Sequence, residues 1–278
     1  MTRKRASSVV LGGLVRFSAI LVAAVLLVIV GYIVVMGVPN LSPSVFAFQY
    51  NSDNVSLFPS LINTLLACAL TLLIAVPLGV LAAVYLVEYT SRGNKFVVLV
   101  RLAAETLAGI PSIVYGLFGM LFFVVFCGMG LSLLSGCLTL AIMVLPTVMR
   151  TTEEALLAVP DAYREGSFGL GAGRLRTVLK VVLPPATPGI LGGIILSIGR
   201  IVGESAALIY TAGTMAQIPG GLFESARTLS VHMYVLSCEG LHIGETYATA
   251  VVLLVIVVLI NAVANLIAKK VMKGHMDA

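Results

Sequence analysis

The feature that most constrains this chain is a series of apolar runs, each long enough to cross the hydrocarbon core of a lipid bilayer. An α-helix needs about 20 apolar residues for that crossing. We find six such runs, at residues 14–37, 61–87, 105–127, 131–150, 188–212 and 246–268. The sequence therefore predicts an all-α, polytopic integral membrane protein with six transmembrane helices.

The composition supports this prediction. Hydrophobic residues make up 59% of the 278 residues and charged residues only 10%, whereas a soluble domain carries about 25% charged residues. A soluble fold of this length could not cover its surface with so few polar groups. The basic residues are scattered between the apolar runs and form no stripe, which excludes a nucleic-acid-binding surface.

The positions of the basic residues predict the orientation in the membrane, because cytoplasmic loops carry the excess of Lys and Arg. If both termini are cytoplasmic, all of the 17 basic residues except Arg200 and Arg227 fall on the cytoplasmic side. The opposite orientation would translocate nearly every positive charge. We therefore expect a multi-pass protein with both termini in the cytoplasm.

Two long segments, 38–60 and 213–245, then face outward, and they contain His232 and His242. Neither histidine has partners at metal-ligand spacing, so we expect solvated loop residues and no metal or cofactor on this chain. Cys127 and Cys137 flank the turn Gly128-Met129-Gly130. A disulfide between them is sterically conceivable, but free cysteines are the favoured interpretation.

The cytoplasmic segment 151–187 is the most patterned part of the chain. Pro160 suits the first turn of a helix, where its missing N–H group is not needed. This helix should run to about Leu170 and stop at Gly171-Ala172-Gly173. A second amphipathic helix, 174–182, should end at Pro184-Pro185. We expect the two helices to form a compact knob at the membrane surface that another protein could bind.

The same segment resembles the permeases of type I ABC importers. Their cytoplasmic signature reads Glu-Ala-Ala, three residues, Gly, nine residues, Ile-x-Leu-Pro. Here it falls on Glu165-Gly166-Ser167, Gly171 and Val181-Val182-Leu183-Pro184 with matching spacing. Gly and Ser replace the two alanines, and Val replaces Ile. The resemblance implies that Glu165, Gly166, Ser167, Gly171, Val181, Leu183 and Pro184 dock in a cleft of a cytoplasmic ATPase.

Three further strings, AAETLAGIPSIVYGLFG, RTTEEALLAVPDAYREGS and IGRIVGESAALIYTAG, resemble the phosphate-specific members of that family, and most of all the PstA type. The resemblance covers residues 61–270 as one transmembrane domain, preceded by an N-terminal helix and first outer loop at 1–60. It implies a bacterial inner-membrane permease that translocates inorganic phosphate. The implied partners are a second homologous permease subunit, a cytoplasmic ATPase dimer and a periplasmic phosphate-binding protein.

The chain contains no G-x-x-x-x-G-K-[ST] sequence, so it should not bind nucleotide itself. We therefore expect a transport subunit and not an enzyme, with ATP used by the partner ATPase.

Arg200 and Glu204 lie inside the run 188–212, and a charge inside a membrane span is costly unless it faces a partner or water. A spacing of four would put both on one helical face, next to the small residues Gly199, Gly203 and Ala207; Gly189 and Gly193 extend these towards the start of the run. Arginine offers forked donors that match phosphate oxygens, so both residues are candidates for the substrate pathway. A buried ion pair that only fixes helix packing remains the alternative.

Other classes of function stay open. The permease could carry another oxyanion, or the chain could be a gradient-driven secondary transporter or channel. Secondary transporters usually show broken helices at matching places, and the sequence does not predict such breaks here. An intramembrane enzyme ranks last, because Arg200 and Glu204 supply neither a nucleophile nor a metal-ligand set.

Overall fold

The computed structural model describes residues 2–91 and 93–276; the side chains of 2–10, 267 and 271–276 lie outside this description. The described residues form helices and no strand. The α-helices are α1 (Thr2–Gly37), α2 (Phe58–Val84), α3 (Lys95–Ala108), α4 (Ser112–Gly119), α5 (Leu133–Leu157), α6 (Asp161–Gly169), α7 (Arg174–Thr177), α8 (Leu183–Val202), α9 (Ala206–Thr211), α10 (Leu229–Glu239) and α11 (Ile243–Met276). Two 3₁₀ turns (Val38–Asn40, Pro43–Phe46) and three π-helical segments, η3 (Tyr85–Tyr89), η4 (Met120–Phe126) and η5 (Val178–Val182), extend or join them.

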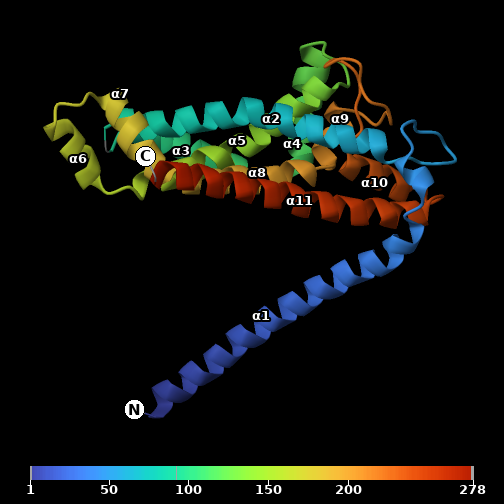
Figure 1. Ribbon diagram of the computed structural model, residues 1–278, viewed down its shortest axis with the longest axis horizontal. Coiled ribbons are helices and arrows are strands. Elements are labelled where there is room, and N and C mark those ends of the chain that lie inside the picture. Colours follow the sequence, from blue (N-terminus) through green and yellow to red (C-terminus); the bar gives the residue numbers. More distant parts are fainter. Residues whose placement is uncertain (1, 92, 277–278) are drawn as a thin grey trace.

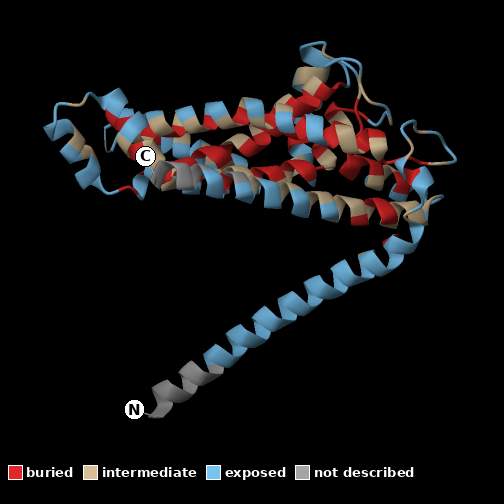
Figure 2. Cartoon of the chain, in the orientation of Figure 1, coloured by how far each residue is buried: buried red, intermediate tan, exposed pale blue. Residues whose placement is uncertain are grey.

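Helix α5 is the centre of the bundle, packed between α2 and α8. In its most apolar window 67% of the residues are buried, compared with none in α1. Figure 1 shows α1 leaving the bundle at a steep angle, and Figure 2 shows it exposed along its described side chains. Only its last turns meet the bundle, where the Tyr32 and Tyr247 hydroxyls lie 3.4 Å apart and Gly37 approaches the Tyr247 backbone. The bundle is therefore built from α2 to α11.

The six predicted spans are found, but one of them is not a single helix. Five helices in the described chain are long and apolar enough to cross a membrane, and a sixth span exists if α3 and α4–η4 count together. These two parts are bent by 103°. The bend falls at 109–111, because Pro111 lacks an N–H donor and pushes the residue before it out of helical geometry. The prediction of a continuous helix over 105–127 was wrong for this reason.

The predicted span 188–212 also differs from the structure. The helix does not end at Pro184-Pro185; α7, η5 and α8 run on as one apolar span from Arg174 to Val202. The two prolines occupy the first turn of α8 after η5, where their missing N–H groups are tolerated. At the other end the helix breaks at 203–205 and resumes as α9. Helix α5 continues past the predicted end at 150, and all four cysteines are free.

Two of the small residues predicted to allow close packing do so in the first half of α8. A Cβ atom at Gly189 would lie 2.6 Å from the Ala155 Cβ, and one at Gly193 would overlap the Thr151 hydroxyl of α5. At Gly199, by contrast, no atom lies within 4 Å of the position that a Cβ atom would take. The close contact between α5 and α8 therefore depends on Gly189 and Gly193.

This contact predicts opposite effects for two adjacent glycines of α8. Gly193→Ala should destabilise the protein by about 1–3 kcal/mol, because the added methyl group forces α5 and α8 apart. Gly192→Ala is the matched control, since nothing lies within 4 Å of its Cβ position and alanine favours a helix. The measurement is the melting temperature of each variant in detergent. Equal melting temperatures would contradict the packing argument.

Candidate functional site

The break between α8 and α9 is held by polar contacts at Glu204. Its side chain is 8% exposed, and its Oε1 accepts the backbone N–H of Ala207 at 3.1 Å. Its backbone carbonyl accepts the hydroxyl of Ser230, at the start of α10. The carboxylate therefore closes the first turn of α9, and the backbone carbonyl links the break to α10.

Arg200 and Glu204 do not form the predicted pair. Helix α8 ends at Val202, with Gly203 as its C-cap, so Glu204 lies beyond the helix and the two residues share no helical face. Among the described side chains, none forms a hydrogen bond or ion pair with the Arg200 guanidinium. Arg200 is half-buried and lies within electrostatic range of the Tyr115 phenol. The hypothesis of an Arg200–Glu204 contact was wrong, because the helix breaks between them.

A second break lies beside the first. The Tyr115 hydroxyl of α4 donates to the Leu107 carbonyl at 2.7 Å and so ties α4 to the end of α3. A Cβ at Gly116 would lie 2.9 Å from the Ala207 Cα, so α4 and α9 are in close contact. Two interrupted spans thus meet near Arg200, contrary to the expectation of no broken helices. In the sequence, the residues that mark these two breaks are the Gly109–Pro111 segment and Gly203.

The predicted knob exists as α6, α7 and η5, at one end of the bundle (Figure 1). Gly171 has a left-handed backbone conformation (φ +81°), which glycine adopts without strain. Helix α6 ends just before it, as predicted. The Ser167 hydroxyl lies 2.8 Å from the Thr177 hydroxyl of α7. Of the other signature residues, two are exposed on α6 (Glu165, Gly166) and three are half-buried in η5 and the first turn of α8 (Val181, Leu183, Pro184).

The knob exposes large apolar side chains. Tyr163 is 54% exposed, Phe168 45%, and Leu170, just after the helix, 92%. Large side chains with this exposure at the tip of a protein mark a surface that a partner can cover.

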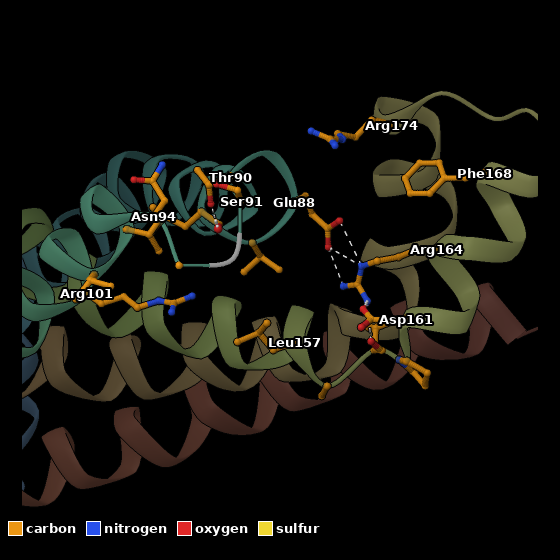
Figure 3. Close-up of a pocket in the computed structure, with 18 residues that line it drawn as sticks. Glu88, Thr90, Ser91, Asn94, Arg101, Leu157, Asp161, Arg164, Phe168 and Arg174 are labelled. Atoms are coloured by element: carbon orange, nitrogen blue, oxygen red, sulfur yellow. Dashed lines mark hydrogen bonds and ion pairs between the residues drawn. The ribbon is translucent and has the colours of Figure 1, made fainter.

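The inward face of α6 carries an ion pair that the sequence analysis missed. Figure 3 shows Arg164 of α6 reaching Glu88, which lies in η3 at the end of α2. The Arg164 Nη2 and Nε atoms donate to Glu88 Oε1 at 2.7 and 3.0 Å. Arg164 also donates to the carbonyls of Leu156 at 2.8 Å and Val159 at 2.7 Å. Arg164 lies in the segment RTTEEALLAVPDAYREGS, which carries part of the family resemblance. No local pattern in the sequence indicates that its partner lies 76 positions away.

A pocket of about 610 Å³ opens beside this pair, between the α2–α3 connection and the knob (Figure 3). On one wall Arg101 donates to Glu153 of α5 at 2.6 Å. On the other wall Arg174 lies over the Tyr89 ring, 5.7 Å from its centroid. Each of these basic groups thus has a partner within the protein, and the pocket separates the knob from α3.

At the opposite end of the bundle, His232 is buried and not solvated as predicted. It lies in α10 with its ring edge against Tyr50, and the Arg227 guanidinium stacks on the same Tyr50 ring at 4.8 Å. Burial and the charge of Arg227 lower the pKa of His232 from 6.5 to about 3. The hydrophilic composition of segment 213–245 hid this burial. His242 is partly exposed, 3.8 Å from Glu245.

No group of three metal-ligating side chains occurs in the part of the chain that the structure describes. The features that could serve function are therefore the paired helix breaks around Arg200 and the knob with its Arg164–Glu88 attachment.

This fold is that of the type I ABC importer permeases. It matches a chain in the crystal structure of a bacterial alginate ABC transporter in complex with an alginate pentasaccharide-bound periplasmic protein, with a TM-score of 0.66 and 17% identity. That match covers 93% of this chain and 95% of the other. It also matches an inward-facing MetNI methionine ABC transporter, with a TM-score of 0.59, 24% identity, and coverage of 77% and 94%.

The chain belongs to the family of binding-protein-dependent transport system inner membrane components, whose pattern matches residues 75–273. It is 35% identical to the probable ABC transporter permease protein YqgI of Bacillus subtilis (strain 168), over 82% of this chain and 83% of that protein. It is 36% identical to the phosphate transport system permease protein PstA 1 of Mycobacterium tuberculosis (strain CDC 1551 / Oshkosh), over 76% and 69%. The resemblance to PstA-type permeases is confirmed, and the chain is a multi-pass membrane permease.

The buried histidine predicts how stability depends on pH. Because the pKa of His232 is about 3 in the folded protein, only the unfolded chain gains its proton as the pH falls below about 6.5, and stability falls by about 1.4 kcal/mol per pH unit. His232→Gln should remove this part, about 2 kcal/mol at pH 5. The measurement is the melting temperature in detergent from pH 7.5 to 5.

His242→Gln is the control, because it replaces a partly exposed histidine and keeps the buried His232; the loss of stability that His232 causes on acidification should persist in it. If His232→Gln and the unmodified protein lost stability in parallel on acidification, the imidazole would not be held neutral by the fold.

Proposed function

We propose that this chain is the permease subunit of an ATP-driven importer that moves inorganic phosphate across a bacterial inner membrane. The observation that carries the proposal is an arginine without an ionic partner among the described side chains, located where two apolar spans break, in a chain similar to phosphate transport permeases. A guanidinium is permanently charged and presents forked donors that fit phosphate oxygens. Arg200 is the proposed substrate contact.

Glu204 has a different proposed role from Arg200. Its carboxylate caps α9, so it shapes the break and adds negative charge near the path without pairing with Arg200. An anion would then be attracted to Arg200 and released again, because no preformed salt bridge has to be broken.

The power source in this proposal is a separate ATPase that binds the knob. The exposed apolar side chains of the knob, Tyr163, Phe168 and Leu170, are the proposed contact, together with the exposed Glu165 and Gly166. Movement of the knob passes into α8 along a continuous helical path, since α7, η5 and α8 form one span. Arg200 lies at the far end of that span.

The other proposed partners are a second, homologous permease subunit and a periplasmic phosphate-binding protein. Helix α1 is apolar and almost free of contacts with its own bundle, which leaves it available to the second permease subunit. The α6–α7 end is proposed to face the cytoplasm. Both termini are then cytoplasmic, because α11 ends at, and α1 starts from, that side of the molecule in Figure 1.

The alternative is transport of a different solute, such as another oxyanion. Structures with this fold are named for methionine and alginate transport, so the fold does not set the cargo. A gradient-driven transporter gains some support from the broken spans. It does not account for a solvent-exposed knob with exposed apolar side chains.

Replacing Arg200 tests the substrate path. Arg200→Gln should reduce uptake of radiolabelled phosphate by at least about 100-fold, because the charged hydrogen-bonding partner of the anion inside the span is lost. Arg200→Lys should retain part of the uptake, since it keeps the charge but not the fork. Arg150→Gln, an exposed arginine of α5, is the control. Normal phosphate uptake by Arg200→Gln would rule out Arg200 as the substrate contact. Uptake of sulfate instead of phosphate by the unmodified transporter would favour the alternative of another oxyanion.

Replacing Leu170 tests ATPase docking. Leu170→Asp should prevent co-purification of the ATPase, because it puts a charge in the centre of the apolar contact. Leu241→Asp is a matched control at the other end of the molecule, since Leu241 is 82% exposed and Leu170 is 92% exposed. Undiminished co-purification with Leu170→Asp would mean that the exposed apolar side chains of the knob are not the docking surface.

A further inference from the structure

We propose that Arg164 and Glu88 form the joint through which movement of α6 reaches α2. They would act as positioning residues that couple ATP hydrolysis to transport, without contact with nucleotide or cargo. This inference rests on the proposed function, because it requires an ATPase bound to the knob.

The attachment of α6 to the bundle is narrow. Every residue of α6 is exposed except Arg164 and Ser167. These two residues are three positions apart and so lie on one face of the helix. Ser167 bonds to Thr177 of α7 and keeps the knob together. Arg164 joins α6 to the end of α2 by side-chain hydrogen bonds, whereas α6 follows α5 directly along the chain.

Arg164 holds two bundle helices at once. Its Nε and Nη2 atoms donate to the Glu88 carboxylate beyond the end of α2. Its Nη atoms also donate to the carbonyls of Leu156, at the end of α5, and Val159, just after α5. The side chains of Arg164 and Glu88 are only 13% and 6% exposed. Salt and water screen such a pair far less than a surface pair, and its forked geometry fixes orientation as well as distance.

The joint complements the covalent path. The knob follows α5 over residues 158–160 and continues through η5 into α8, so without the joint it would keep its links to α5 and α8 along the chain but lose its hydrogen bonds to the end of α2. With the joint, α2, α5 and α8 move together. Both attachments involve π-helical segments: Glu88 lies in η3, and the chain passes from the knob through η5 before it enters α8. Such segments occur frequently at functional sites.

The test uses the full complex, with both permease subunits, the ATPase and the binding protein, in proteoliposomes. Arg164→Gln and Glu88→Gln should each leave the ATPase bound and its basal hydrolysis near the unmodified rate. Transport per ATP hydrolysed should fall roughly tenfold, within the range that coupling networks show. A merely structural role would lower the amount of folded complex and leave this ratio unchanged.

A second ion pair provides the control. Arg101 and Glu153 join α3 to α5 with a bond of 2.6 Å and belong to no element of the knob. Arg101→Gln and Glu153→Gln should therefore leave transport per ATP unchanged. If they reduced the ratio as strongly as Arg164→Gln, the effect would belong to the bundle in general, and the proposal would be overturned.

The remaining outcomes are also decisive. An unchanged ratio in Glu88→Gln and Arg164→Gln overturns the joint, as does loss of bound ATPase with a normal ratio in the complexes that remain. If Arg164→Gln does not fold, Glu88→Gln still tests the joint, because it keeps the carbonyl bonds of Arg164. Failure of the proposed function is distinct: the unmodified complex would then hydrolyse no ATP or move no anion. If it moves a different anion, the ratio measured with that anion still tests the joint.

Discussion

The structure depends on how the protein satisfies backbone groups that are freed where a helix breaks inside an apolar span. Lipid cannot hydrogen-bond to these groups, so other parts of the protein must do so or the break cannot persist. At the α8–α9 break the Glu204 carboxylate accepts a backbone N–H, and a hydroxyl of α10 donates to the Glu204 carbonyl. At the α3–α4 break the Tyr115 hydroxyl donates a hydrogen bond to the Leu107 carbonyl. Glu204 and Tyr115 are therefore required by the breaks themselves.

The two breaks and the knob are linked by the packing of α5. Gly189 and Gly193 let α8 lie directly on α5, and α2 packs on α5 from another direction. Because α8 continues from the knob to Arg200 without a break, a small rotation at the knob displaces the α8–α9 break as well. Close-packed helices shift as units and do not deform continuously. A coupling mechanism in the proposed importer can therefore use few contacts.

The sequence predicted those features that depend on local pattern. Hydropathy located the spans, and Pro160 and Gly171 set the start and end of α6 to within a residue or two. The break at 203–205 was not predicted, because glycines at four-residue spacing serve equally for close helix packing and for a helix end. The burial of His232 was hidden by a polar loop composition. The pairing of Arg164 with Glu88 joins positions 76 apart, and no local pattern encodes such a contact.

The electrostatic setting of Arg200 follows from the same break. The C-terminal end of a helix carries a partial negative charge that stabilises a nearby cation, and Arg200 lies in the last turn of α8. Had the helix continued, Glu204 would lie one turn away and could neutralise Arg200 directly. Because the chain breaks, the Glu204 carboxylate instead accepts a hydrogen bond from α9. The positive charge of Arg200 is then partly balanced by the end of α8 and by this carboxylate, with no direct ion pair among the described side chains. In the proposed importer, such an arrangement attracts an anion without binding it irreversibly, and its strength changes whenever α8 and α9 move relative to each other.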